Sequence, residues 1–167
     1  MGLLGDDTEG LFSDVYSLVK QWKPSRDYKD EDEYRDDLVR FLLKMSKNPR
    51  TEITKESGRS LADVAIKNSL GRIGIELKLN FHKSSEHDRL IGQLSRYAEE
   101  YDGIIVCLVG KTDPLKFRSL RAKLKDIQGK YDGNLFGSAT KYFGLVDKQS
   151  DIGSDSNKNN KEHLSFW

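Results

Sequence analysis

Three side chains in the middle of the sequence have the types and spacing needed to cleave a phosphate ester. Asp63 opens a short apolar segment, and Glu76 and Lys78 lie two residues apart in the next one. Residues two apart in a strand project from the same face of the sheet, so Glu76 and Lys78 would point the same way. Carboxylate oxygens are preferred ligands of Mg²⁺, which can activate water for attack on phosphorus. The lysine could orient or deprotonate that water, or stabilise the transition state, and the sequence does not choose among these roles.

The segments that carry these residues predict two strands joined by a hairpin. The apolar runs cover residues 63–67 and 72–79, and the four residues between them, Asn68-Ser69-Leu70-Gly71, are few enough for a tight turn. A hairpin would bring Asp63 beside Glu76, although twelve residues separate them in the chain.

The other apolar periodicities predict helices on both sides of this hairpin and three further strands. Helical spacing is found over residues 8–22, 30–45, 88–100 and from Pro114 to about residue 127. Short strands are expected over 51–54, 103–109 and 142–146. Residues 103–109 are apolar on both faces, which predicts a strand in the interior of the sheet. Thr8 and Asp30 are placed to begin the first two helices. We therefore expect an α/β fold with a mixed central sheet of about four or five strands flanked by helices.

Composition limits the compartment and the kind of site. The single cysteine, Cys107, excludes an intramolecular disulfide and a cysteine zinc cluster. No apolar stretch approaches the ~20 residues needed to cross a bilayer, and the start lacks the basic-then-apolar layout of a secretory signal. We expect a cytoplasmic protein that does not contact the membrane.

Charge is distributed unevenly along the chain. Residues 1–37 hold 11 acidic and 5 basic side chains, and residues 147–167 hold 4 acidic and 3 basic ones. Because the formal net charge is +1, residues 38–146 carry a net charge of +8. A basic body favours a phosphate-rich partner, since each neutralised phosphate releases counterions, although a lysine-rich surface can also be merely solvated.

A chain of 167 residues fits one domain with its own core. We expect an N-terminal helix and linker over residues 1–29, a domain over 30–146 that carries Asp63, Glu76 and Lys78, and a disordered tail over 147–167. The tail is assigned from its composition, which is dominated by Ser, Asn, Asp and Lys.

The order of these motifs resembles the PD-(D/E)XK nuclease superfamily, and its restriction-endonuclease-like and RecB-like branches in particular. The resemblance covers roughly residues 30–110, with an acid on a helix, then Asp63-Val64-Ala65-Ile66, Gly74-Ile75-Glu76-Leu77-Lys78 and Gln93-Leu94-Ser95-Arg96-Tyr97. Ala62 stands where the signature has proline, a departure that is common in the superfamily. The resemblance implies a restriction-endonuclease-like fold and metal-dependent hydrolysis of nucleic acid, with DNA favoured over RNA.

The resemblance also implies roles for the residues on the hairpin. Asp63, Glu76 and the Leu77 carbonyl would bind Mg²⁺, or Mn²⁺ in its place, and Lys78 would be the catalytic lysine. The family has a further acid on the preceding helix, which reaches the metal directly or through water. Because positions 31, 34, 38 and 42 share one helical face, we choose Glu31 over Glu33, although both could serve only to favour the helix N-terminus.

The helix over residues 88–100 carries the remaining candidates. Gln93 and Tyr97 match the Q-x3-Y pattern of the RecB-like branch, whose glutamine helps to hold the active site or the nucleic acid. Arg89 and Arg96 recur beside Gln93 at helical spacing and could contact phosphates, as could Tyr97.

The sequence thus predicts a Mg²⁺-dependent endonuclease or exonuclease. Little chain remains for base readout, which favours a structure-selective or accessory enzyme over a site-specific restriction enzyme. One alternative is a nucleic-acid-binding module of the same fold without turnover, although an intact set of Asp63, Glu76 and Lys78 argues against it. Another is a nuclease effector or toxin domain that acts on DNA or RNA. A homodimer is expected only by analogy with related enzymes.

Overall fold

The computed structural model describes residues 7–132 and 140–148; the predicted tail from residue 149 onward lies outside the described residues. The elements in chain order are α1 (Thr8–Gln21), α2 (Glu31–Met45), β1 (Glu52–Lys55), β2 (Val64–Asn68), β3 (Gly71–Leu79), α3 (Ser84–Glu100), β4 (Gly103–Val109), α4 (Pro114–Asp132) and β5 (Tyr142–Asp147). Each helix and strand expected from the apolar spacing is therefore present, β4 with the predicted bounds and the others with shifted ends.

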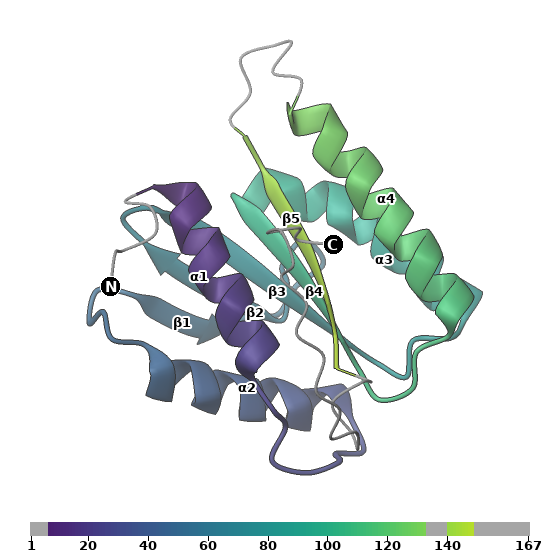
Figure 1. The fold of residues 1–167 in the computed structure, drawn as a ribbon, viewed down its shortest axis with the longest axis horizontal. Helices are drawn as coiled ribbons and strands as arrows, with labels where there is room; N and C mark the ends of the chain where they lie inside the picture. The colour runs from purple at the N-terminus through teal and green to yellow at the C-terminus, as the bar shows by residue number, and fades with distance from the viewer. Residues whose placement is uncertain (1–6, 133–139, 149–167) are drawn as a thin grey trace, which may run out of the picture.

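One mixed sheet, with its strands in the order β1-β2-β3-β4-β5, forms the middle of the molecule (Figure 1). β1, β2 and β3 pair antiparallel, and β4 and β5 pair parallel to their preceding neighbours. Asn68 pairs with Gly71, which confirms the predicted hairpin between β2 and β3. The parallel pairs need crossover connections, and α3 and α4 supply them. The predicted α/β fold with a mixed sheet flanked by helices is confirmed.

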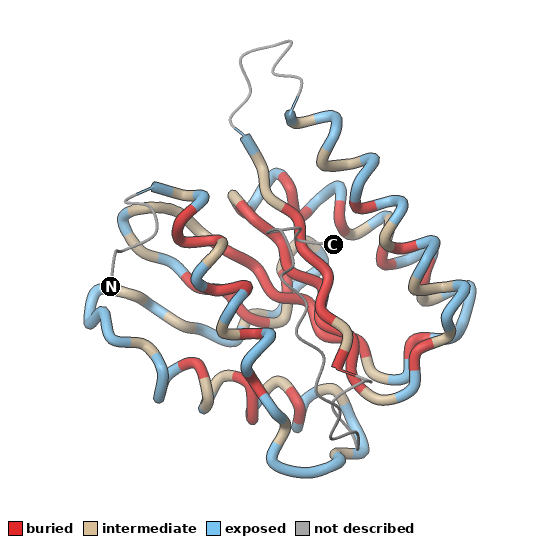
Figure 2. The backbone as a smooth tube through the Cα atoms, in the orientation of Figure 1, coloured by how far each residue is buried: buried red, intermediate tan, exposed pale blue. Residues whose placement is uncertain are grey.

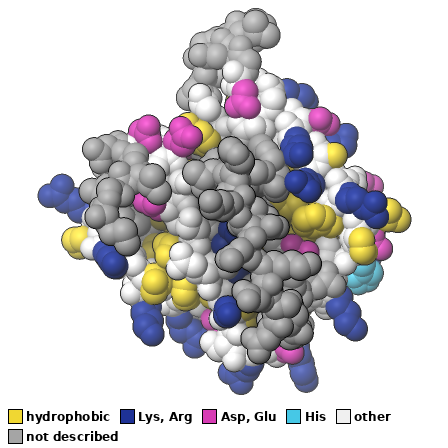
Figure 3. All heavy atoms as spheres, viewed as in Figure 1, with side chains coloured by type: hydrophobic (Ala, Val, Ile, Leu, Met, Phe, Trp, Pro, Cys, Tyr) yellow, Lys and Arg dark blue, Asp and Glu magenta, His cyan; other side chains and the backbone are white. Residues whose placement is uncertain are grey.

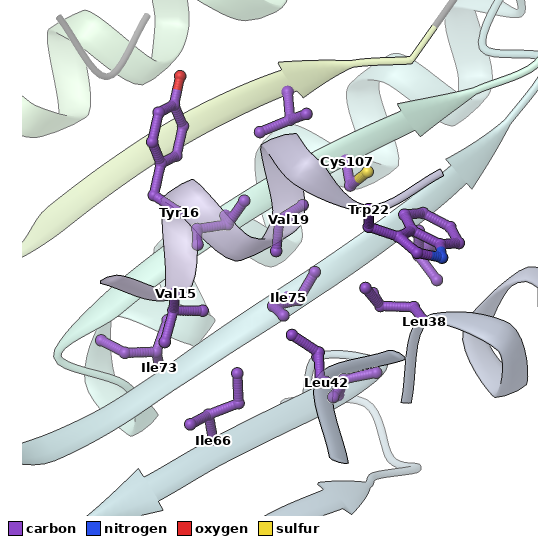
Figure 4. Packing of buried hydrophobic residues seen from close by; sticks show 14 of the residues in the cluster. Val15, Tyr16, Val19, Trp22, Leu38, Leu42, Ile66, Ile73, Ile75 and Cys107 are labelled. Carbon is purple, nitrogen blue, oxygen red and sulfur yellow. The ribbon is translucent and has the colours of Figure 1, made fainter. Parts of the chain in front are cut away.

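Two helices cover each face of the sheet. α1 and α2 lie on the face to which β3 presents Ile73, Ile75 and Leu77, and their apolar side chains pack there (Figure 4). α3 and α4 pack against the opposite face, where β4 presents alternate residues such as Val106. β4 is buried at every position, as its apolar composition predicted, and Figure 2 shows this interior strand in red.

The start of α1 differs from the prediction. Asp7, and not Thr8, is the N-cap, and its carboxylate accepts a hydrogen bond from the Gly10 N–H at 2.9 Å. Thr8 is the first helical residue, and its hydroxyl donates to the Leu70 carbonyl at 2.7 Å. A carboxylate at this position also interacts favourably with the helix dipole, which explains why the acid takes it.

α1 lies close against the last two strands because two glycines leave room for its rings. A Cβ on Gly103 would lie 2.5 Å from a ring carbon of Phe12, and a Cβ on Gly144 would lie 2.9 Å from a ring carbon of Tyr16. Phe12 is fully buried there. The N-terminal helix thus shares one hydrophobic core with the sheet that positions Asp63, Glu76 and Lys78.

Candidate active site

The candidate site lies near the C-terminal end of β3, where this strand extends past its partner β2. The last pair of the hairpin is Val64 with Ile75, so Glu76 and the residues after it have no β2 residue beside them. Asp63, directly before β2, lies there instead, and its Oδ2 accepts a hydrogen bond from the Leu77 N–H at 2.8 Å. The hairpin therefore brings Asp63 next to the strand segment that carries Glu76.

Glu76 and Lys78 form a buried ion pair on the α3 side of the sheet. The Lys78 Nζ lies 2.7 Å from Glu76 Oε1, and the two residues are only 8% and 3% exposed. The other carboxylate oxygen, Oε2, accepts a hydrogen bond from the Tyr97 hydroxyl at 3.1 Å. Both oxygens of Glu76 thus have a fixed partner, and the side chain is held in one orientation.

Burial and neighbouring charges shift the ionisation of this pair. Burial raises the pKa of Glu76 to about 7, and the nearby Asp63 carboxylate contributes to the rise, while Lys78 and Tyr97 oppose it. Burial alone would lower the pKa of Lys78, but the carboxylates of Glu76 and Glu31 outweigh it and hold that pKa above its usual value. The site therefore combines a lysine that stays charged with a carboxyl group that titrates near neutrality.

α2 contributes the third carboxylate. Glu31 is the first residue of α2, and its Oε2 lies 3.6 Å from Lys78 Nζ. Burial raises the pKa of Glu31, and the charges of Asp63 and Glu86 raise it further, whereas Lys78 lowers it. Glu33 is exposed and accepts a hydrogen bond from the Lys29 N–H at 3.4 Å. Of the two acids considered, Glu31 is the one that lies at the site.

The candidate residues on α3 are buried to different degrees. Tyr97 is 1% exposed and its hydroxyl binds Glu76, so it lies beneath the carboxylates and not on the outer surface where it was expected to meet nucleic acid. Gln93 is partly buried, and its Oε1 has no hydrogen-bond partner among the described residues. Arg89 and Arg96 are exposed, and neither forms an ion pair with another described residue.

Sequence reasoning missed Glu86 and the hydrogen bond between Tyr97 and Glu76. Glu86 lies in the first turn of α3, close enough for its charge to affect Glu31. Positions 86, 93 and 97 are spaced at seven and four residues and therefore share one helical face. That spacing is the signal that could have grouped these three side chains in advance.

The donor atoms fit a divalent cation of the Mg²⁺ type in their chemistry. Asp63 and Glu76 supply carboxylate oxygens, and the repulsion between them, which contributes to the raised pKa of Glu76, is what a bound cation relieves. The Leu77 N–H points towards Asp63, and the carbonyl of the same strand residue points to the same edge, beyond the end of β2. Within residues 7–132 and 140–148, no group of three or more His, Cys, Asp or Glu side chains is arranged to hold a metal. Two carboxylates with several waters are nevertheless a usual shell for Mg²⁺.

Comparison of the chain with protein-family models, with curated proteins and with solved structures gave no match. None of the helices in the described part of the chain is long and apolar enough to cross a membrane. The chemistry of the site is therefore the basis for inferring a function.

Proposed function

We propose that the protein is a metal-dependent nuclease that hydrolyses phosphodiester bonds of nucleic acid, with DNA as the favoured substrate. The observation that carries this proposal is the meeting of Asp63, Glu76 and Lys78 at the end of one hairpin, in the order that the PD-(D/E)XK motif requires. Glu31, on the preceding helix, lies against Lys78. We also propose that the α/β fold is of the restriction-endonuclease-like kind.

Each residue has a distinct role in the proposed mechanism. Asp63, Glu76 and the Leu77 carbonyl would hold Mg²⁺ or Mn²⁺, and Tyr97 keeps the second oxygen of Glu76 oriented. When bound, the cation lowers the pKa of the attacking water and neutralises charge on the phosphate. Lys78 stays protonated beside its carboxylates, so it can donate to a phosphate oxygen as negative charge develops there.

A basic surface supports nucleic acid as the partner. Lys and Arg side chains gather over α4 in Figure 3, and α3 adds Arg89 and Arg96. The exposed basic residues of α4 are Arg118, Lys123, Lys125 and Lys130. Side chains of this kind bind phosphates without regard to sequence, and such binding weakens as the salt concentration rises.

A cleavage assay tests the proposal. Labelled single-stranded DNA, duplex DNA, a branched junction and RNA are incubated with Mg²⁺, Mn²⁺ or EDTA, using the wild type, Asp63→Asn and Glu76→Gln. Asparagine keeps an oxygen that can accept a hydrogen bond from the Leu77 N–H. Asp63→Asn therefore removes the charge without leaving the Leu77 N–H unpaired. We expect metal-dependent cleavage in the wild type and its loss in both variants, with DNA cut in preference to RNA.

Glu33→Gln is the control for the loss of one carboxylate charge near the site, because Glu33 lies two residues from Glu31 but is exposed and accepts its hydrogen bond from the Lys29 N–H. It should cleave like the wild type. Cleavage that persists in EDTA, or that survives both site substitutions, would refute the proposed chemistry.

The second candidate is a binding module of the same fold without turnover. It is favoured by the Lys78 ammonium on Glu76, which occupies a carboxylate oxygen that a metal would otherwise use. Shifted bands at low salt in the absence of any cleavage would support this candidate.

A further inference from the structure

A second polar network lies beside the site and plays no part in the chemistry above. It joins Glu56, just after β1, to Arg72 in β3 and to Tyr101, just after α3. Arg72 Nη2 lies 2.6 Å from Glu56 Oε1, and the Tyr101 hydroxyl donates to Glu56 Oε2. The Arg72 guanidinium also lies over the Tyr101 ring, 4.6 Å from its centroid. The three side chains therefore hold one another through both oxygens of Glu56.

The residues of the network are hydrogen-bonded to the segment that carries Asp63. The Glu56 N–H donates to the Asp63 carbonyl at 2.9 Å, and the Tyr101 hydroxyl accepts from the Ala62 N–H at 3.1 Å. Both ends of residues 56–63 are thus tied to the network. These residues have no strand partners of their own, because β1 ends at Lys55 and β2 begins at Val64.

The burial of the network makes its contacts stronger than those of a surface ion pair. The Glu56 and Arg72 side chains are 15% and 28% exposed, and Tyr101 is 1% exposed. Burial, together with the hydrogen bond to Glu56, raises the pKa of Tyr101, so its hydroxyl keeps its proton and remains a donor. A charge-assisted set of this kind is shielded from water and from salt.

We propose that Glu56, Arg72 and Tyr101 are positioning residues that fix the Asp63 carboxylate relative to Glu76 and so set the affinity of the site for a divalent cation. The proposal rests on the proposed function. It follows from geometry, because metal sites tolerate displacements of only about 0.5 Å and Asp63 lies outside any strand.

Three variants and one control test this role. Tyr101→Phe keeps the ring and removes the hydroxyl that links Glu56 to Ala62, and Arg72→Ala removes the cation. Arg72→Lys is the conservative variant, which keeps a positive charge for Glu56. Glu100→Gln is the control, because the half-exposed Glu100 carboxylate lies 3.7 Å from Arg72 Nη1, whereas Glu56 pairs with the other guanidinium nitrogen, Nη2.

The measurements are Mn²⁺ affinity, metal-dependent cleavage and hydrogen exchange at the Leu77 amide, whose proton bonds to the Asp63 carboxylate. We expect Tyr101→Phe and Arg72→Ala to lose roughly 10- to 100-fold in Mn²⁺ affinity and cleavage, as outer-shell substitutions do. Their Leu77 amide should exchange faster, Arg72→Lys should recover part of the loss, and Glu100→Gln should match the wild type.

Equal protection of the Leu77 amide in wild type and Tyr101→Phe would overturn the positioning role, as would unchanged Mn²⁺ affinity. If the wild type cleaves nothing, the proposed function fails, but the amide still decides whether the network positions Asp63. If Arg72→Ala does not fold, Tyr101→Phe alone carries the test.

Discussion

Glu76 is the residue on which the electrostatics of the site depend. It is almost fully buried, faces the charge of Asp63 and is bonded by Lys78 and Tyr97. Removing its charge therefore changes the pKa values of Lys78 and Tyr97, and its own titration should be visible in the stability of the whole protein.

The metal-free protein should lose stability as the pH rises. The folded-state pKa of Glu76, about 7, lies above its ordinary value of 4.5, so the folded protein binds this proton more tightly than the unfolded chain. The stabilisation is complete below pH 4.5 and is lost as the pH passes 7. Thermal unfolding of wild type and Glu76→Gln between pH 4 and 8, without metal, checks this: the fall in stability should be smaller in the variant. Identical pH dependence in both proteins would contradict it.

Tyr97→Phe should shift the pH dependence of cleavage. The Tyr97 hydroxyl stabilises the ionised form of Glu76, so its loss raises the pKa of Glu76 further. The acidic limb of the rate profile should move to higher pH, with a larger loss of activity at pH 6 than at pH 9. Tyr131→Phe, on α4, is the control and should leave the profile unchanged. A uniform loss at all pH values would mean that the hydroxyl acts in some other way.

At the scale of elements, the start of α2 sets the position of Glu31. The Asp30 carboxylate accepts from the Glu33 N–H at 2.9 Å and begins the helix one residue before Glu31. This confirms the helix start expected from the sequence. The first turn of α2 is therefore both a stabilising cap and the support for a site residue.

Asp30→Ala should lower the free energy of unfolding by about 1 kcal/mol, the usual loss for an N-cap. Asp32→Ala is the matched control in the same turn, since Asp32 is exposed and its one ion pair among the described residues is with Arg35, at 2.9 Å. Urea unfolding of both variants measures the difference. Equal losses would mean that the cap contributes no more than general charge.

Apolar spacing was sufficient to predict the elements, because each helix buries apolar residues at helical spacing and the strands β2 to β5 are largely buried. Residues 103–109 are the clearest case: seven positions without a polar side chain predicted a strand inside the sheet, and β4 lies between β3 and β5. The α/β class and the hairpin that joins Asp63 to Glu76 followed from the same pattern. The expected role of each site residue stays a prediction.

Features that depend on contacts between distant elements could not be predicted in this way. α3 begins at Ser84, earlier than the expected residue 88. The sequence did not indicate this start, because the first turn of the helix is polar and its N-cap, Lys83, makes no side-chain capping bond. The network of Glu56 and Tyr101 joins residues 45 apart in the chain, and no local pattern marks it. Helix ends without a cap and buried polar networks both require the folded chain.

At the scale of the whole molecule, Asp37 joins the two helices on one face of the sheet. It is 5% exposed and accepts hydrogen bonds from Trp22 Nε1 at 3.2 Å, the Ser25 N–H at 2.9 Å and the Tyr28 hydroxyl at 2.5 Å. Burial alone would raise the pKa of Asp37, but these hydrogen bonds together hold it below 3.8. The carboxylate thus fastens α1 and its following segment to α2.

Asp37→Ala should lower the free energy of unfolding by roughly 2–4 kcal/mol, because three hydrogen-bond donors lose a buried acceptor at once. Since the folded-state pKa is lowered, the stabilisation is present above pH 3.8 and disappears as the pH falls through the folded pKa. Chemical unfolding should therefore show a larger difference in stability between wild type and variant at pH 7 than at pH 3. Asp36→Ala, which loses one exposed ion pair with Lys55, should cost less than about 1 kcal/mol. An equally small loss of stability in Asp37→Ala would contradict the role of Asp37 in fastening α1 to α2.

The hydrogen bond from the Leu77 N–H to Asp63 has a consequence for how this chain can change over generations. A lineage that gave up the proposed cleavage would be free to replace the charge of Lys78, yet on its β2 side Leu77 would still lack a strand neighbour, since β2 begins at Val64, which pairs with Ile75. Selection for folding alone would then keep an oxygen acceptor at position 63, with asparagine tolerated and alanine or leucine removed. An inactive descendant would therefore retain the outline of an active site that it no longer uses.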